Sequence, residues 1–316
     1  MSNSPRFVSE AEALARLDRS KVKQALRNAF AGLASGTTVQ PAQTVTVFPN
    51  EEGDCIFYPG MIWDLNLLGV KVSPYISALK RAGKYPVTAY TLLLSASTGE
   101  PVLLCDSYAL TTSRTAATTA LALEYLTPAS AKVLTVIGVG KIGLEHLRYV
   151  SEQRVWSEIR AWSPSLSTDP VKAKSVIDIM QTDGILVSIA KSARDALRGA
   201  DVVMLCTSSG MPVIEVDWLE PNAVVTSIST NSPKAHEIAP SSLANLQVFC
   251  DYRATAPVTA GEMQLAIEEG NWTPADVLGD LPELAVGRVV RPKAGRTYFR
   301  STGLGVEDLA IASLLL

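Results

Sequence analysis

Three glycines of this chain have the spacing of a dinucleotide-binding turn. Gly138, Gly140 and Gly143 are spaced G-x-G-x-x-G, directly after the apolar stretch VLTVI and before a segment of helical character. In that context the first glycine permits a tight turn, the second lets backbone approach a pyrophosphate, and the third allows a helix to pack closely on a strand. Free N–H groups at the helix start would face the phosphates. The predicted cofactor-binding residues of this turn are Gly138, Val139, Gly140, Lys141, Ile142 and Gly143; the alternative is a purely structural turn.

The choice of dinucleotide depends on the segment RAWSPSLST, where the second strand of such a fold ends. A carboxylate there would accept hydrogen bonds from the ribose diol and repel a 2′-phosphate, but no acid occurs before Asp169. Hydroxyls that could donate to a phosphate instead belong to Ser163, Ser165, Ser167 and Thr168. This favours NADP(H). NAD(H) is the alternative, because the turn carries Pro164 and no arginine.

Two cations in apolar surroundings could hold a carboxylate. Lys71 lies in the strand-like segment LGVKVSPY, where Val70 and Val72 should point to the opposite face. Arg114 lies in TTSRTAATTALALEYL, a segment of helical character rich in alanine, and a guanidinium there can fork a carboxylate. Taken alone, Lys71 could instead be a surface lysine, and Arg114 could instead form a salt bridge.

The spacing of apolar residues changes along the chain and predicts the elements that position these residues. Residues 10–33 have apolar positions at helical spacing and predict one amphipathic helix before the breaker Ser35-Gly36. Residues 38–106 contain short β-rich pieces, which predict one mixed or antiparallel sheet. From residue 131 strands and helices alternate, which predicts a parallel sheet with helices on both faces because parallel strands need crossovers. The tail predicts a strand, a glycine turn and a helix that returns to the first domain.

Composition argues against several kinds of partner. The 316 residues are 47% hydrophobic with a net charge of −3, so neither nucleic acid nor an anionic membrane surface is expected. The start lacks an apolar signal region, and no later run approaches the roughly 20 apolar residues of a membrane span, which predicts a cytoplasmic location.

Four scattered cysteines and two histidines predict reduced structural thiols and no metal site. His146 is expected to be a packing or helix-surface histidine. The cysteines are Cys55, Cys105, Cys206 and Cys250.

Four segments, in this order and spacing, resemble the ornithine cyclodeaminase and mu-crystallin family: TTSRTAATTALALEYL, VIGVGKIGLEHL, ISTNSPKAHEI and YFRSTGLGVEDLAIA. The resemblance covers nearly the whole chain. It implies an α/β protein with a Rossmann-type, doubly wound parallel sheet domain at residues 129–295. Residues 1–128 and 296–316 would form an α+β domain for substrate binding and dimerisation. The implied partners are a small imino or amino acid and a second copy of the chain, in a homodimer through the N-terminal sheet.

The family's functional residues match this sequence only in part. A lysine in G-x-K-x-V and the arginine of R-T-A-A hold the substrate carboxylate in members of the family, and these correspond to Lys71 and Arg114. A second arginine that many members carry in P-x-R is Gln43 here. The cyclodeaminases use an aspartate in D-x-P as acid and base, and Asn231 stands at that place. An amide cannot exchange a proton with an amine, so Asn231 can only hydrogen-bond.

This departure favours reduction of a preformed cyclic imine over cyclodeamination. Mu-crystallin, which resembles this chain and acts as a ketimine reductase, also lacks the aspartate. We expect NAD(P)H-dependent hydride transfer to Δ1-pyrroline-2-carboxylate or Δ1-piperideine-2-carboxylate, giving L-proline or L-pipecolate. The catalytic residues would be Lys71, Arg114 and Asn231, with Lys71 also a proton donor if burial lowers its pKa. Further substrate-binding residues would be Gln43, Tyr58 and Met61, and further cofactor-binding residues Thr207, Ser208, Ser301 and Gly303.

Three alternatives remain open at this point. An ornithine or lysine cyclodeaminase, which is a lyase, would need another acid, and Glu237 and Glu262 are the candidates in the sequence. An open-chain imine reductase or amino-acid dehydrogenase would use the same cofactor together with free ammonia or an amine. The third is a binding protein that keeps the nucleotide fold without turnover.

Overall fold

The computed structural model describes residues 5–229 and 234–316. It divides into two compact units. Unit 1 consists of Met1–Ala117 together with Gly303–Leu316, and unit 2 is Thr118–Thr302. The chain passes from unit 1 into unit 2 within helix α4 (Tyr108–Leu126), and it returns directly after strand β15 (Thr297–Arg300).

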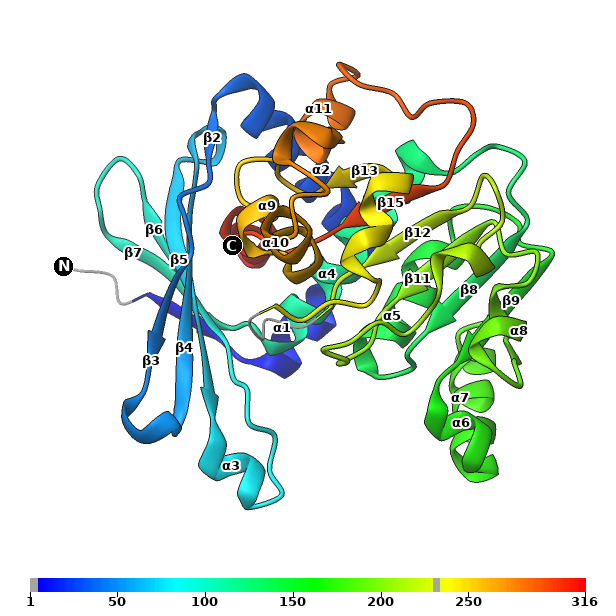
Figure 1. Cartoon of the computed structure of the whole chain (residues 1–316). Coiled ribbons are helices and arrows are strands. Elements are labelled where there is room, and N and C mark those ends of the chain that lie inside the picture. The colour runs from blue at the N-terminus through cyan, green and yellow to red at the C-terminus, as the bar shows by residue number, and fades with distance from the viewer. Residues whose placement is uncertain (1–4, 230–233) are drawn as a thin grey trace. The chain divides into compact units, whose positions relative to one another are not determined.

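Unit 1 contains a seven-stranded mixed sheet (Figure 1). The strands follow the order β1-β7-β6-β5-β4-β2, and β3 also pairs with β4. Only the β1–β7 pair is parallel among the described strands of this sheet. The sequence prediction of one mixed or antiparallel sheet is confirmed. The strands are β1 (Arg6–Val8), β2 (Thr38–Val39), β3 (Thr44–Val47), β4 (Gly53–Ile62), β5 (Leu67–Ile76), β6 (Tyr90–Ser95) and β7 (Pro101–Asp106).

Helices cover one face of this sheet, and the described side chains on the other face are mostly partly exposed. The β4–β5 register pairs Tyr58 with Lys71, so both side chains point to the same face, and Val70 and Val72 point to the opposite one. Helix α12 (Gly305–Ala312) packs on β4 and β5 and also against α2 (Arg19–Ser35). The approach is close, because a Cβ at Gly60 would lie 3.0 Å from Val306. The tail helix therefore belongs to unit 1, on the Lys71 face.

The predicted single N-terminal helix is wrong in one respect. The chain forms two helices, α1 (Glu10–Arg16) and α2. Asp18 has extended backbone, and its carboxylate accepts hydrogen bonds from the Lys21 N–H at 2.9 Å and from the Ser20 hydroxyl. Asp18 thus acts as the N-cap of α2 and ends the first helix. The remaining helices of unit 1 are η1 (Pro49–Glu51), η2 (Trp63–Leu65), α3 (Ser77–Arg81) and η6 (Ser313–Leu315).

Unit 2 is built on an eight-stranded parallel sheet with the order β10-β9-β8-β11-β12-β15-β13-β14 (Figure 1). Its first five strands in sequence take the order 3-2-1-4-5 of a Rossmann sheet, which confirms the predicted fold class. The central strands β11 and β12 are buried throughout and β8 nearly so, as expected for parallel strands inside such a sheet. The strands of this sheet are β8 (Val133–Ile137), β9 (Glu158–Trp162), β10 (Ser188–Ile189), β11 (Val202–Leu205), β12 (Val224–Ser227), β13 (Gln247–Cys250), β14 (Val277–Asp280) and β15.

The helices of unit 2 are short apart from two. They are α5 (Lys141–Ser151), α6 (Pro164–Thr168), α7 (Pro170–Thr182), α8 (Ala193–Leu197), η3 (Val216–Trp218), η4 (Pro240–Asn245), α9 (Ala256–Thr259), α10 (Gly261–Glu268), η5 (Pro274–Asp276) and α11 (Leu281–Ala285). In the described part of the chain, no helix has the length and hydropathy needed to cross a membrane.

Candidate cofactor and substrate sites

The glycine turn has the geometry of a dinucleotide site. It follows β8, beside the point where the strand order reverses, which is where Rossmann sheets bind dinucleotides. A Cβ at Gly138, whose φ is 98°, would lie 2.4 Å from the Cys206 carbonyl oxygen, and a Cβ at Gly143 would lie 2.0 Å from the Gly138 oxygen. Gly140 instead borders open space and is the N-cap of α5, with no side-chain cap. The first and third glycines are needed for packing, and the second leaves helix N–H groups free for a phosphate.

His146 is a packing residue. It is fully buried, with Nδ1 2.7 Å from the Ile142 carbonyl oxygen and Nε2 2.9 Å from the Thr119 hydroxyl. Burial lowers its pKa to about 4, so the imidazole is neutral near pH 7. Both ring nitrogens are engaged within unit 2, which agrees with the sequence prediction of a packing role.

Glu237 organises the loops at the carboxyl ends of β11 and β12. One oxygen of its carboxylate accepts hydrogen bonds from the N–H and the hydroxyl of Thr207, both at 2.7 Å. The other oxygen accepts from the Ser227 hydroxyl at 2.7 Å and from the Ser229 N–H at 2.9 Å. Glu237 itself is fully buried. Predicted cofactor residue Thr207 is thus held by a carboxylate, and its neighbour Ser208 is exposed.

Glu262, the other acid considered as a replacement for the missing aspartate, lies in a separate buried network of unit 2. Its Oε1 is 3.0 Å from Arg300 Nε and accepts a hydrogen bond of 2.8 Å from the Tyr298 hydroxyl. Burial and the nearby Glu262 charge raise the pKa of Tyr298 well above its usual value. Ser301, a predicted cofactor residue, follows β15 and is buried, with its hydroxyl 3.4 Å from Asp251. Glu237 and Glu262 therefore both serve contacts inside unit 2.

A lysine lies beside the serines that were predicted to bind the adenosine end of the cofactor. The Ser163 and Ser165 hydroxyls, at the end of β9, are 3.0 Å apart. Lys172, on the first turn of α7, donates from Nζ to the Ser165 hydroxyl at 2.8 Å. The turn itself carries no arginine, but the following helix brings a lysine back to it. The carboxylate of Asp169 is occupied as the N-cap of that helix, accepting from the Lys172 N–H.

Lys71 and Arg114 meet in unit 1, inside a buried cluster with two acids of α12. Lys71 Nζ is 2.7 Å from Asp308 Oδ2. Arg114 contacts Asp308 through Nε and Glu307 through Nη1, each at 3.2 Å. All four side chains are at least 93% buried. We call Lys71, Arg114, Glu307 and Asp308 the charged quartet. Lys71 is therefore a paired cation, which corrects the assumption from sequence that it stands alone.

The surroundings shift the pKa values of the two cations in opposite directions. Burial lowers the pKa of Lys71 to about 8, while Asp308 opposes that fall and Arg114 adds to it. Burial would also lower the pKa of Arg114, but Asp308 and Glu307 raise it above its ordinary value. Lys71 can thus change its protonation state near neutral pH, whereas Arg114 is a permanent cation.

Of the other residues predicted to bind substrate, Gln43 and Tyr58 lie near the charged quartet and Met61 does not. The Tyr58 ring centroid is 4.2 Å from Lys71 Nζ, a cation–π contact. Gln43 donates from Nε2 to the Gly303 carbonyl at 2.5 Å. A Cβ at Gly303, with φ of 80°, would lie 2.3 Å from Arg114 Nη1, so this turn lies directly against the guanidinium. Met61 pairs with Leu68 and points to the opposite face of the sheet from Lys71, so the structure does not place it beside the quartet.

Glu307 and Asp308 were missed at the sequence level. Their signal was visible: they are two adjacent acids within the otherwise apolar segment LGVEDLAIA. Adjacent buried carboxylates in such a helix need cationic partners. Asn231, the predicted catalytic amide, lies outside the described residues.

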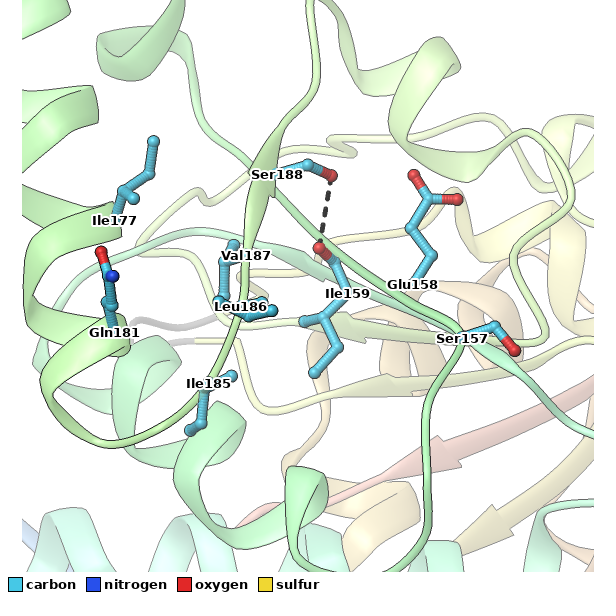
Figure 2. Close-up of a pocket in the computed structure, with 9 residues that line it drawn as sticks. All are labelled: Ser157, Glu158, Ile159, Ile177, Gln181, Ile185, Leu186, Val187 and Ser188. Carbon is cyan, nitrogen blue, oxygen red and sulfur yellow. Dashed lines mark hydrogen bonds between the residues drawn. The ribbon is translucent and has the colours of Figure 1, made fainter.

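In the part of the chain that the structure describes, the cysteines form no disulfide or metal site, and the surface hollow lies away from the glycine turn. All four cysteines are free and buried, and no metal-binding group of three or more His, Cys, Asp or Glu occurs among the described residues. Figure 2 shows a surface hollow near the amino ends of β9 and β10, where the Ser188 hydroxyl donates to the Ile159 carbonyl. Dinucleotides bind at the carboxyl ends of parallel strands, so this hollow is not the cofactor site. Its lining is Ser157, Glu158, Ile159, Ile177, Gln181, Ile185, Leu186, Val187 and Ser188.

Strand order and glycine turn together place unit 2 in the class of Rossmann-type dinucleotide-binding domains. A model of the ornithine cyclodeaminase/mu-crystallin family matches residues 4–316. The chain belongs to this family, as its sequence motifs indicated.

The relatives of the chain include a dehydrogenase and several reductases. The chain is 46% identical over 313 residues to an NAD(P)H-dependent anabolic L-arginine dehydrogenase of Pseudomonas aeruginosa, covering 99% of this chain and 96% of that protein. It is 26% identical over 320 residues to the ketimine reductase mu-crystallin of Macropus fuliginosus, covering 100% and 98% of the two chains. A Δ1-pyrroline-2-carboxylate reductase structure from Thermococcus litoralis, in complex with NADH and L-proline, superposes with a TM-score of 0.90 at 23% identity, covering 98% and 95%. This likeness establishes the fold.

Proposed function

We propose that this protein is an NAD(P)H-dependent reductase of 2-imino acids that forms L-amino acids. The observation that carries the proposal is the meeting of Lys71 and Arg114 in one buried cluster. A permanent guanidinium and a titratable ammonium suit a carboxylate next to a reacting C=N bond. The glycine turn and the uncapped start of α5 fit the pyrophosphate of a dinucleotide, which supplies the hydride when bound.

In this proposal Arg114 and Lys71 hold the substrate carboxylate, and Lys71 exchanges a proton with the substrate nitrogen. Its pKa of about 8 suits that task, because an acid works best when its pKa lies near the working pH. The ring of Tyr58 holds the Lys71 ammonium through the cation–π contact. Gln43 stabilises the Gly303 turn, which lies against Arg114. The two acids considered for the lyase alternative, Glu237 and Glu262, are both engaged within unit 2.

We further propose an open-chain substrate: the 2-imino acid that forms from a 2-oxo acid and ammonia, with the arginine skeleton as the first to test. The support is the 46% identity to an arginine dehydrogenase along almost the whole of both chains. A cyclic imino acid, as predicted from sequence, is the second candidate. It is favoured by relatives named ketimine reductase and Δ1-pyrroline-2-carboxylate reductase, each 26% identical.

One assay separates these candidates. Purified protein is incubated with NADPH or NADH and either 2-oxo-5-guanidinopentanoate with ammonium, Δ1-pyrroline-2-carboxylate or Δ1-piperideine-2-carboxylate, and the absorbance of the reduced cofactor is followed. The open-chain proposal predicts cofactor oxidation that needs both oxo acid and ammonium. Oxidation with the cyclic imines alone would select the second candidate. Ammonia release from ornithine, without net cofactor oxidation, would restore the cyclodeaminase.

For the cofactor we propose a preference for NADP(H), carried by Ser163, Ser165 and Lys172. Two hydroxyls and an ammonium in contact suit a 2′-phosphate, and none of the three would repel it. Lys172→Ala is expected to lower the preference for NADPH over NADH by about tenfold, about 1.4 kcal/mol. Lys174→Ala, an exposed lysine on the same helix, is the matched control. Steady-state kinetics with each cofactor give the ratio, and an unchanged ratio in Lys172→Ala would rule out this assignment.

We also propose that the uncovered face of the unit 1 sheet pairs with a second copy of the chain. A partly exposed apolar face of this kind suits association with another copy, and an archaeal alanine dehydrogenase with bound NAD, which shares this fold, is a dimer. The residues of this face are Phe7, Phe57, Met61, Leu68, Val70, Val72, Leu92, Leu94 and Leu104.

Val70→Glu tests the dimer. It lies in the middle of the uncovered face, so a charge there is expected to give monomers of 33.7 kDa, where the unchanged protein gives a mass twice as large. Light scattering after size exclusion provides the mass. A monomeric wild-type protein would contradict the proposal.

A further inference from the structure

The charged quartet is balanced in charge before any substrate arrives. Lys71 and Arg114 contribute two positive charges, and Glu307 and Asp308 contribute two negative ones. Among the described residues, uncharged side chains near the quartet include the Tyr58 ring, the Thr111 hydroxyl at 3.5 Å from Lys71 and, on β7, the Cys105 thiol. Burial raises the pKa of Cys105 to about 11, so that thiol is neutral. The cluster as a whole is therefore neutral.

A neutral buried cluster discriminates between substrates by their net charge. A ligand whose only charge is a carboxylate adds one uncompensated negative charge to groups that are almost fully buried. Burying an uncompensated charge costs free energy. A ligand whose reacting end carries both a carboxylate and a protonated nitrogen leaves the net charge of the site unchanged. Its cation can offset the α12 acids while its carboxylate contacts Lys71 and Arg114. Binding of amino and iminium acids is then favoured over binding of oxo, hydroxy or neutral imino acids.

We propose that Asp308 and Glu307 make this site selective for substrates whose α-nitrogen is positively charged. This inference rests on the proposed function, in which Lys71 and Arg114 hold the substrate carboxylate. The two acids of α12 contact the cations directly, whereas Glu237 and Glu262 are committed within unit 2. Asp308 carries the larger share, because it contacts both cations and Glu307 contacts Arg114.

The test compares pairs of ligands that share a skeleton and differ in charge at the α position. For the open-chain candidate the pair is L-arginine and its 2-hydroxy analogue. For the cyclic candidate it is L-proline and pyrrole-2-carboxylate, whose ring nitrogen is not basic. Dissociation constants are measured with the full-length protein saturated with NADP⁺. The unchanged protein is expected to bind the charged-nitrogen member at least about tenfold more tightly, about 1.4 kcal/mol.

Asp308→Asn and Glu307→Gln remove one negative charge each with little change in volume. Asp308→Asn is expected to reduce the selectivity to about threefold or less, and Glu307→Gln to reduce it by a smaller factor. Glu52→Gln, the same chemical change at an exposed ion pair of unit 1, is the matched control and should leave the ratio unchanged.

Each result of these binding measurements either supports the inference or contradicts it. If the unchanged protein binds the charged-nitrogen ligand and its analogue equally well, the inference is wrong. This result needs no variant, so it holds even if a variant fails to fold. A ratio that survives Asp308→Asn also overturns it. If no member of either pair binds, the proposed function has failed, and the inference falls with it.

Discussion

Lys71→Met is expected to lower kcat/KM for the amino-acid or imino-acid substrate by about a hundredfold to ten-thousandfold, the range seen when an acid–base group is lost. Methionine keeps most of the side-chain volume but loses the ammonium that contacts Asp308 at 2.7 Å. Arg114 still contacts Asp308 and Glu307, so the acids keep one cation and the protein should fold. Cofactor affinity, measured by NADPH titration, should change little because the glycine turn lies in unit 2.

The same residue sets the pH dependence. Lys71 is charged below its pKa of about 8 and neutral above it, so kcat/KM for imine reduction should fall as the pH rises through about 8. Asp308 raises the pKa of Lys71, so Asp308→Asn should move this limb to lower pH. Lys84→Met, which removes an exposed ammonium of unit 1, is the control. Unchanged kcat/KM in Lys71→Met, or loss of NADPH binding in it, would contradict the assignment of roles.

Glu237→Gln is expected to weaken cofactor binding by about tenfold to a hundredfold. The carboxylate accepts four hydrogen bonds, two of them from the backbone N–H groups of Thr207 and Ser229. An amide has one oxygen, so its NH₂ group must face one of those N–H donors, and a buried unsatisfied donor costs about 1–3 kcal/mol. The loops after β11 and β12 would then rearrange at the edge of the sheet where dinucleotides bind.

Two readouts separate this role from a general loss of stability. The KM for the cofactor should rise more than the KM for the amino acid, and the melting temperature should fall by about 2–4 °C for each kcal/mol lost. Glu215→Gln, at an exposed carboxylate of the same unit, is the matched control. A lower melting temperature with unchanged cofactor KM would reduce Glu237 to a structural residue.

Features encoded within a few residues were predictable from the sequence. The glycine turn could be predicted because Gly138, Gly140 and Gly143 lie close together in the sequence, directly after an apolar strand. The alternation of Lys71 with Val70 and Val72 follows from strand geometry alone. The break between α1 and α2 was missed although Asp18 and Ser20 form a recognisable cap.

Features that depend on distant parts of the chain were not predictable. Asp308 lies 194 residues after Arg114, and only the packing of α12 on the unit 1 sheet brings the two together. Lys172 lies seven residues after Ser165 and reaches it because α7 turns back, which periodicity does not reveal. Met61 was assigned to the substrate on size and flexibility, but its register places it on the other face.

The incorporation of nitrogen during turnover tests the central claim most directly. The protein is incubated with NADPH, 2-oxo-5-guanidinopentanoate and isotopically labelled ammonium, and the amino acid formed is analysed by mass spectrometry. Our account predicts L-arginine that carries one labelled nitrogen per NADPH oxidised. Absence of labelled amino acid and of cofactor oxidation, here and with both cyclic imines, would contradict the assignment of this protein as a 2-imino acid reductase.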